Sequence, residues 1–190
     1  MSVWARWIGR LDGIADRVLR WDEAALTAVS ESSIMRPFSR VFTVATILGD
    51  GYIWGGLALG LLLFGGSIDR YNVLIACGVS IVNIGLFRFL KVVFARSRPS
   101  FAVDTGLRSR MIDSYAFPSG HAATSFGLAY LVQVSYPSIG IGVLVYSVAG
   151  VIALSRVYMR EHFPLDVIFG AAFGTAVAWL LYPFFRWLFL

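Results

Sequence analysis

The sequence predicts an all-α integral membrane protein, a polytopic transmembrane helical bundle of about five spans, or six, preceded by interfacial amphipathic helices. Hydrophobic residues make up 58% of the 190 positions, and the mean hydropathy is +0.74. Charged residues account for only 14%, which is too few to cover the surface of a soluble domain. Several apolar runs approach the ~20 residues that a helix needs to cross a bilayer.

The N-terminal segment predicts a helix that is apolar along one side. Residues 3–20 place bulky apolar side chains at helical spacing, with arginine and aspartate over much of the remainder. This pattern fits a helix lying in the head-group layer, and it equally fits a helix docked on the protein's own bundle. A second, weaker helix is expected over residues 22–33, before Pro37.

The rest of the chain predicts the spans. Residues 41–49 predict an interfacial or buried helical piece, Asp50-Gly51 a break, and residues 51–66 the first span. Further spans are expected at 71–94, 121–137, 139–156 and 165–185. The 121–137 segment is short and should face neighbouring helices, and Gly170 and Gly174 should allow close helix packing. We therefore expect one domain over 1–190, with interfacial helices in 1–49 and a bundle in 51–190 that carries a polar loop at 96–117.

Composition also limits the partners and cofactors. Cys77 is the only cysteine, so neither a disulfide framework nor a cysteine metal site is available. The net charge of +5 is spread between apolar runs and forms no continuous basic face, which favours anionic lipid head groups over nucleic acid. Nothing in the sequence indicates an oligomeric state.

Three short polar islands interrupt the apolar sequence. They cover residues 91–99, 118–121 and 155–166, and they contain the only lysine and both histidines of the chain. Between the first and second islands the chain does not cross the membrane, and between the second and third it crosses twice. All three islands should therefore lie on one membrane face. Imidazoles beside fixed cations predict a site for an anion, with proton transfer near neutral pH.

Each island also has a purely structural interpretation. Lys91 either binds the anion together with Arg98 or extends to the membrane surface from the end of its span. Ser119 and Gly120 either present backbone N–H groups to an anion or form an ordinary capping turn before a helix.

In the third island, Arg156 offers a fork of donors that suits phosphate oxygens. Asp166 either orients His162 through one ring nitrogen or only complements the dipole of its helix. We favour the anion site because the three islands should converge.

These motifs resemble the three signatures of the type 2 phosphatidic acid phosphatase superfamily, which includes membrane lipid phosphate phosphatases. The matching motifs are Lys91-x6-Arg98-Pro99, Pro118-Ser119-Gly120-His121 and Ser155-Arg156-x5-His162-x3-Asp166. The resemblance implies that His162 attacks phosphorus, that Asp166 orients it, and that His121 protonates the leaving oxygen and later activates water. It implies phosphate binding by the remaining signature residues, namely Lys91, Arg98, Ser119, Gly120 and Arg156. It also implies that the enzyme needs no metal or other cofactor.

The resemblance predicts a lipid phosphatase that acts on a phosphomonoester or diphosphate such as phosphatidate, phosphatidylglycerol phosphate, a polyprenyl diphosphate or lipid A. A lipid phosphotransferase with the same phosphohistidine intermediate is an alternative, and a non-catalytic lipid-binding protein is a more distant one. Arg160-Glu161 departs from the small or apolar residues common before the nucleophile, and this pair is expected to face head-group water or to shape substrate preference.

The resemblance further implies a multi-pass protein of the bacterial cytoplasmic (inner) membrane. Arginine counts place the site in the cytoplasm, whereas bacterial relatives often face the periplasm, so both orientations stay open.

Overall fold

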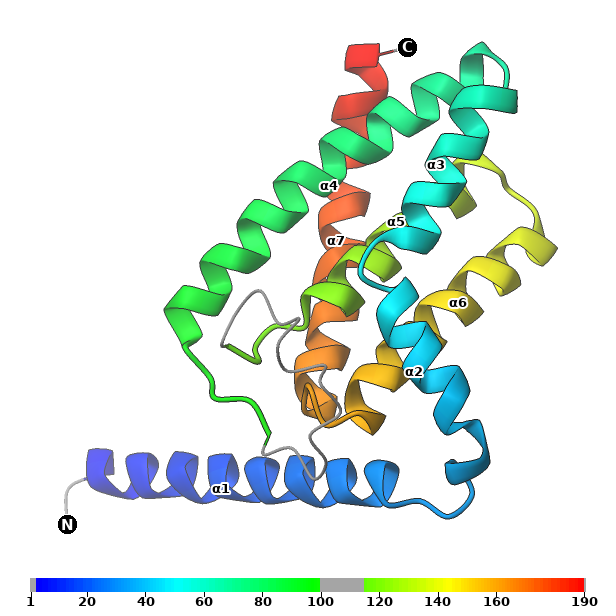
Figure 1. Cartoon of the computed structure of the whole chain (residues 1–190). Coiled ribbons are helices and arrows are strands. Elements are labelled where there is room, and N and C mark those ends of the chain that lie inside the picture. The colour runs from blue at the N-terminus through cyan, green and yellow to red at the C-terminus, as the bar shows by residue number, and fades with distance from the viewer. Residues whose placement is uncertain (1–2, 100–114, 190) are drawn as a thin grey trace.

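The structure is a bundle of α-helices with one long helix lying across its end (Figure 1). The computed structural model describes residues 3–99 and 115–189, and it describes side chains from Gly13 onward. The helices are α1 (Val3–Ser30), η1 (Arg36–Phe38), α2 (Ser39–Leu48), α3 (Tyr52–Phe64), α4 (Ser67–Phe94), α5 (Gly120–Ser135), α6 (Ile139–Tyr158) and α7 (Pro164–Phe189). The described ranges contain no β-strand, so the predicted all-α class is confirmed.

Helices α4, α6 and α7 are long and apolar enough to cross a membrane. The pair formed by η1–α2 and α3 is bent by 59° and qualifies as a fourth span if it is counted as one. Helix α5 has 16 residues; at 1.5 Å per residue it is about 24 Å long, shorter than a ~30 Å hydrocarbon core. Large apolar side chains such as Phe64, Ile81, Ile139 and Trp187 remain exposed around the bundle. This is the surface expected of an integral membrane protein.

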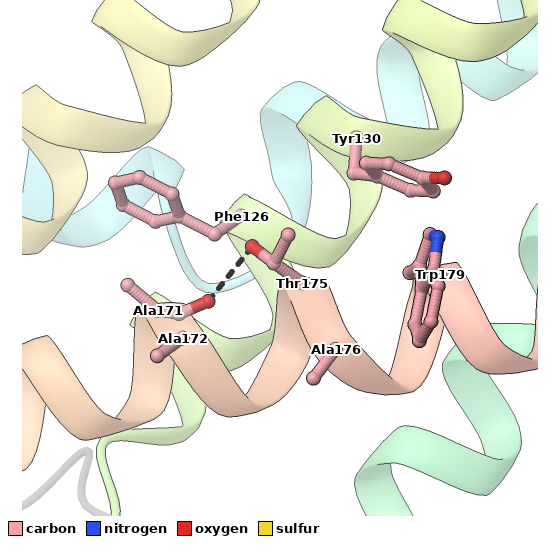
Figure 2. A pocket seen from close by; sticks show the side chains of 7 residues that line it. All are labelled: Phe126, Tyr130, Ala171, Ala172, Thr175, Ala176 and Trp179. Atoms are coloured by element: carbon pink, nitrogen blue, oxygen red, sulfur yellow. Dashed lines mark hydrogen bonds between the residues drawn. The ribbon is translucent and has the colours of Figure 1, made fainter.

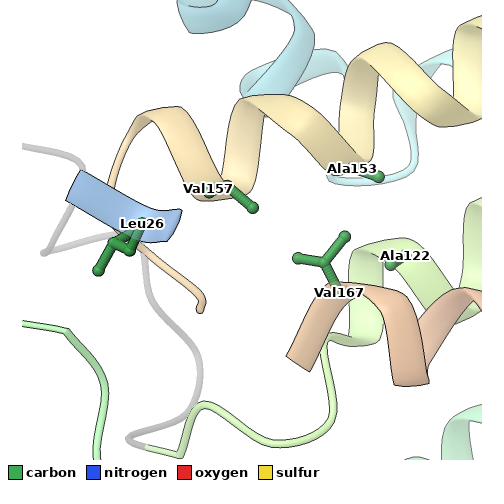
Figure 3. Close-up of a cluster of buried hydrophobic side chains, with 5 residues drawn as sticks. All are labelled: Leu26, Ala122, Ala153, Val157 and Val167. Carbon is green, nitrogen blue, oxygen red and sulfur yellow. The ribbon is translucent and has the colours of Figure 1, made fainter. Parts of the chain in front are cut away.

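Helix α1 combines both interpretations of the N-terminal segment. It is one continuous helix where the sequence predicted two, because no glycine or proline interrupts residues 14–30. Leu26 is buried in one cluster with Val157 of α6 and Val167 of α7, which Figure 3 shows. Ile14 and Val18 stay exposed, so one stripe of α1 docks on the bundle while an adjacent apolar stripe remains uncovered. The predicted pattern of residues 3–12 involves side chains outside the described part.

The closest helix packing joins α5 to α7. A side chain on Gly174 would collide with the backbone of Ala123, and one on Gly127 would lie 3.0 Å from the carbonyl oxygen of Gly174. A side chain on Gly170 would lie 2.5 Å from the carbonyl oxygen of Ser119. The predicted role of Gly170 and Gly174 in close packing is confirmed. This contact brings the start of α5 beside the start of α7, where two of the three polar islands lie.

An apolar pocket of about 470 Å³ opens further along the same two helices (Figure 2). Its walls come from Phe126 and Tyr130 of α5 and from one side of α7 that ends at Trp179. None of the predicted site residues lines it. The predicted site residues lie instead at the end of the bundle that α1 covers. Cys77 is exposed on α4 and is free.

Replacing Gly174 with alanine should loosen the contact between α5 and α7. Because the added methyl group meets backbone and not a movable side chain, we expect the free energy of unfolding to fall by about 1–3 kcal/mol. Thermal unfolding of purified protein in detergent would measure this change. Gly56→Ala is the matched control, since its methyl group would have no neighbour within 4 Å. Equal melting temperatures for the two variants would contradict the packing argument.

Candidate active site

His162 lies in the short connection between α6 and α7, and its side chain is only 1% exposed. Burial lowers the pKa of His162 well below its ordinary value of 6.5, and the positive charges of Arg98 and Arg156 lower it further. The backbone N–H of His162 donates to the carbonyl oxygen of Arg156 at 3.2 Å, which fixes the connection to the end of α6. At neutral pH the imidazole is therefore uncharged and holds a lone pair available for attack.

Cations from distant parts of the sequence gather around this imidazole. Lys91, Arg98 and Arg156 are all close enough for their charges to act on His162. Lys91 is 3% exposed, and its Nζ donates to the carbonyl oxygen of Tyr115 at 2.8 Å. This inward contact is inconsistent with a lysine that extends to the membrane surface. Arg98 Nη1 donates to the carbonyl oxygen of Glu161 at 3.0 Å, which places this guanidinium beside the histidine connection.

Arg156 is held by two residues that sequence reasoning did not select. Its Nη1 donates to Thr46 Oγ1 of α2 at 2.7 Å, and its Nη2 forms an ion pair with the buried carboxylate of Glu161. Burial raises the pKa of Glu161, although the positive charges of Arg156 and Arg98 oppose the rise. Glu161 therefore fixes the guanidinium plane of Arg156. The expectation that Glu161 faces head-group water is wrong, since this side chain is only 3% exposed.

Arg160 also differs from expectation. It lies two residues beyond the end of α6 with a positive φ of 57°, and its Nη1 donates to Ser30 Oγ at 3.1 Å. A second contact of 3.6 Å reaches the carboxylate of Glu31. Arg160 thus points to the C-terminal end of α1 and helps to dock that helix. The sequence shows the charge pair Arg160-Glu161, but it does not indicate which partners the two side chains contact.

The second island begins α5 beside the start of α7. Ser119 occupies the N-cap position, but its side chain makes no capping hydrogen bond. Its backbone N–H donates to the carbonyl oxygen of Asp166 at 3.0 Å, while its buried hydroxyl has no hydrogen-bond partner among the described residues. Gly120 lies against Phe87, whose ring would be 2.9 Å from an added side chain. His121 follows, and its Nε2 lies 2.6 Å from Asp50 Oδ1.

Asp166 lies near His162 without forming a hydrogen bond to it. The distance from Asp166 Oδ2 to His162 Nδ1 is 3.8 Å, beyond hydrogen-bond length. Oδ2 instead accepts the backbone N–H of Phe163 at 2.9 Å, and Oδ1 accepts Arg96 Nη1 at 2.6 Å. The carboxylate faces the Nδ1 side of the ring, which leaves Nε2 as the nitrogen directed away from Asp166.

Arg96 joins two buried carboxylates and was not among the predicted site residues. Its Nη2 contacts Asp22 Oδ2 of α1 at 2.6 Å, while its Nη1 holds Asp166. The other oxygen of Asp22 accepts the backbone N–H of Leu165 at 2.9 Å. Arg96 belongs to the first island, but the sequence indicated no role for it. Asp22 lies 74 positions earlier, in α1. These contacts attach helix α1 to the start of α7, directly after the connection that carries His162.

All eight sequence-predicted residues lie at the end of the bundle covered by α1. Those that act electrostatically on His162 include Lys91, Arg98, Arg156 and His121. Ser119 is joined to Asp166 through the backbone, and Gly120 lies between Ser119 and His121. Most of the predicted polar loop, residues 100–114, lies outside the described residues. A neutral imidazole, a second imidazole and three cations can together stabilise a phosphoryl group and transfer protons around it.

Removing the guanidinium of Arg96 should destabilise the fold. Arg96→Gln would leave the carboxylates of Asp22 and Asp166 buried without their cation, and both are 0% exposed. Breaking a buried ion pair in this way costs roughly 3–5 kcal/mol, and we expect about the lower value because the Arg96 side chain is 23% exposed. Thermal unfolding in detergent is the measurement. Arg17→Gln is the control, since Arg17 is exposed and its Nε bonds only within its own helix; equal losses would rule out the proposed fastening.

Comparison with known proteins identifies the family of this chain. Residues 72–190 match the PAP2 superfamily. The chain is 29% identical over 118 residues to a lipid A 4'-phosphatase from Bacteroides thetaiotaomicron, covering 59% of this chain and 52% of the relative. It is 31% identical over 134 residues to an undecaprenyl-diphosphatase from Sulfolobus acidocaldarius, covering 70% and 63%. The matched segments thus span between half and two thirds of these relatives' lengths.

A solved structure extends the similarity to nearly the whole chain. The transmembrane PAP2-type phosphatidylglycerolphosphate phosphatase from Bacillus subtilis superposes with a TM-score of 0.71 at 25% identity, covering 90% of this chain and 87% of that protein. The family match covers more than half of the chain and includes all three polar islands. The chain belongs to the PAP2 superfamily, whose members named here are phosphatases.

Proposed function

We propose that this protein hydrolyses a phosphomonoester or diphosphate of a membrane lipid through a phosphohistidine formed on His162. The observation that carries the proposal is the buried, uncharged imidazole surrounded by Lys91, Arg98 and Arg156. A nucleophile has to be deprotonated, while a phosphoryl group brings negative charge that needs fixed cations. The site provides both at one point.

The first step transfers the phosphoryl group to the enzyme. The lone pair of His162 forms a nitrogen–phosphorus bond, the bond from phosphorus to the lipid oxygen breaks, and that oxygen takes a proton from His121. Lys91, Arg98 and Arg156 balance the charge on the phosphoryl oxygens. The unpartnered hydroxyl of Ser119 and the backbone N–H of Gly120, in the first turn of α5, are further donors.

The second step releases phosphate. Water attacks phosphorus and gives a proton to His121, and the nitrogen–phosphorus bond breaks to restore His162. Asp166 stabilises the imidazole ring as positive charge develops on it, from its position 3.8 Å from Nδ1. Because the charge compensation comes from three side-chain cations, the proposal includes independence from metal ions.

The substrate class follows from the surroundings of the site and from the named relatives. The site lies where α1 crosses the end of an apolar bundle, so a lipid can arrive laterally with its head group at this level. Lipid A phosphates, polyprenyl diphosphates and phosphatidylglycerol phosphate are the head groups that the relatives' names indicate. We propose one of these classes, in a single-domain protein of the bacterial inner membrane.

Replacing His162 with alanine should abolish phosphate release, because it removes the buried imidazole on which the charges of Lys91, Arg98 and Arg156 act. The assay offers purified protein in detergent micelles a panel of lipid monophosphates and diphosphates and measures released phosphate with and without EDTA. Wild-type protein should release phosphate from at least one lipid, with equal rates under both conditions. Circular dichroism would check that the variant remains folded.

Several results of this assay would count against the proposal. Full turnover by His162→Ala would remove the nucleophile assignment, and loss of activity in EDTA would remove the metal-independent mechanism. Transfer of phosphate to an added acceptor lipid in preference to water would identify a phosphotransferase with the same intermediate. If the wild type releases phosphate from none of the lipids, the protein is not a phosphatase for these substrate classes.

His162 should remain uncharged in mildly acidic solution. Its pKa is lowered by burial and by neighbouring cations, so it should gain a proton only well below pH 6.5. A histidine NMR titration of the His121→Gln variant would follow His162 alone, since the chain has only two histidines. Protonation at or above pH 6.5 would contradict the described environment. Catalysis should show the same direction, with the acidic limb of the pH–rate profile below pH 6.5.

A further inference from the structure

Asp50 contacts the second histidine of the site from a part of the chain that precedes the three islands. Its Oδ1 lies 2.6 Å from Nε2 of His121, although the two residues are 71 positions apart. Asp50 lies between α2 and α3, whereas His121 is in the first turn of α5. Carboxylate–imidazole contacts of this length are charge-assisted hydrogen bonds when the ring is protonated.

The break between α2 and α3 places Asp50 at this point. The sequence there is Gly49-Asp50-Gly51, and the helices on either side meet at 59°. Gly51 has a φ of +115°, which favours glycine, and a side chain on Gly49 would lie 2.6 Å from Ile152. The two glycines therefore allow a sharp turn that fits tightly against α6. Without the turn, a helix running straight from α2 into α3 would carry residue 50 elsewhere.

Charges of both signs face His121 from the surrounding elements. Arg156 of α6 and Arg98 after α4 supply positive charge, and His162 lies near enough for the two imidazoles to interact. Asp50 supplies the negative charge. A proton donor for the lipid oxygen must itself be protonated, which burial and two neighbouring guanidinium groups oppose. The carboxylate of Asp50 is positioned to offset them.

We propose that Asp50 is the positioning residue for the acid–base histidine, and that it holds His121 through Nε2 in the protonated form. This inference rests on the proposed function. In the first step, the proton on Nδ1 passes to the leaving lipid oxygen as the bond from that oxygen to phosphorus breaks, while the proton on Nε2 stays on the ring and remains hydrogen-bonded to Asp50. In the second step, Nδ1 takes a proton from the attacking water. No further reactant is needed.

The same geometry permits one competing role. Arg156 Nη1 lies 4.0 Å from Asp50 Oδ1, so the carboxylate sits between a phosphate-binding cation and an imidazole. It could therefore occupy the place of a phosphate oxygen and be displaced by substrate. If Asp50 positions His121, removing the charge of Asp50 should slow catalysis. If Asp50 occupies the place of a phosphate oxygen, removing its charge should strengthen phosphate binding and leave the rate intact or higher.

The experiment compares Asp50→Asn and Asp50→Glu with wild type, using a lipid phosphate and an aryl phosphate whose leaving group needs no protonation. Asp50→Asn should lower kcat on the lipid phosphate by about 10–100-fold, with KM changed by less than about 2-fold. The loss on the aryl phosphate should be smaller. The alkaline limb of the pH–rate profile should move to lower pH, and Asp50→Glu should restore part of the rate. Glu23→Gln removes the same charge from an exposed position of α1 and serves as the control.

Histidine NMR separates this inference from the proposed function. The chain has two imidazoles, and His162→Ala identifies the signals of His121. Asp50→Asn should shift the protonation of His121 to lower pH whether or not any tested lipid is hydrolysed. An unchanged titration of His121 would overturn the proposal. Equal loss on both substrates with an unmoved pH profile, or an unchanged kcat with tighter inhibition by inorganic phosphate, would also overturn it.

Discussion

The burial of an uncharged imidazole among fixed cations is the constraint on which the rest of this structure depends. His162 is almost fully enclosed, and positive charges act on it from Lys91, Arg98 and Arg156. Such a concentration of like charge in a poorly solvated place is unfavourable unless it is compensated. The carboxylate of Glu161 compensates part of this positive charge through its ion pair with Arg156. Backbone carbonyl groups accept hydrogen bonds from Lys91 and Arg98. A phosphoryl group would add the remaining negative charge.

Helix packing brings the components of this arrangement to the same point. Small residues let α5 and α7 approach until the backbone N–H of Ser119 bonds to the carbonyl oxygen of Asp166. The starts of both helices, with His121 on one and Asp166 on the other, are thereby fixed relative to His162. Larger residues at Gly170 or Gly174 would separate the helices and also the proposed catalytic groups. In this protein, the close packing of apolar helices therefore also sets the geometry of the polar site.

The first third of the chain contributes side chains to the proposed site. The family match begins at residue 72, yet Asp22, Thr46 and Asp50 all reach the site from earlier positions. Asp22 acts through Arg96, Thr46 through Arg156, and Asp50 directly on His121. Helix α1 and the bend between α2 and α3 therefore connect the N-terminal region to the orientation of the proposed catalytic groups.

The sequence by itself determined the all-α membrane class, the three islands and their gathering at one end of the bundle, because apolar run length and the number of crossings are local properties. It also indicated the close approach at Gly170 and Gly174. It did not show that α1 is one helix, that Glu161 is buried, or that Arg96 joins Asp22 to Asp166. Those outcomes were decided by tertiary structure, since an ion pair between residues 74 positions apart depends on how helices dock, and side-chain type alone does not encode that distance.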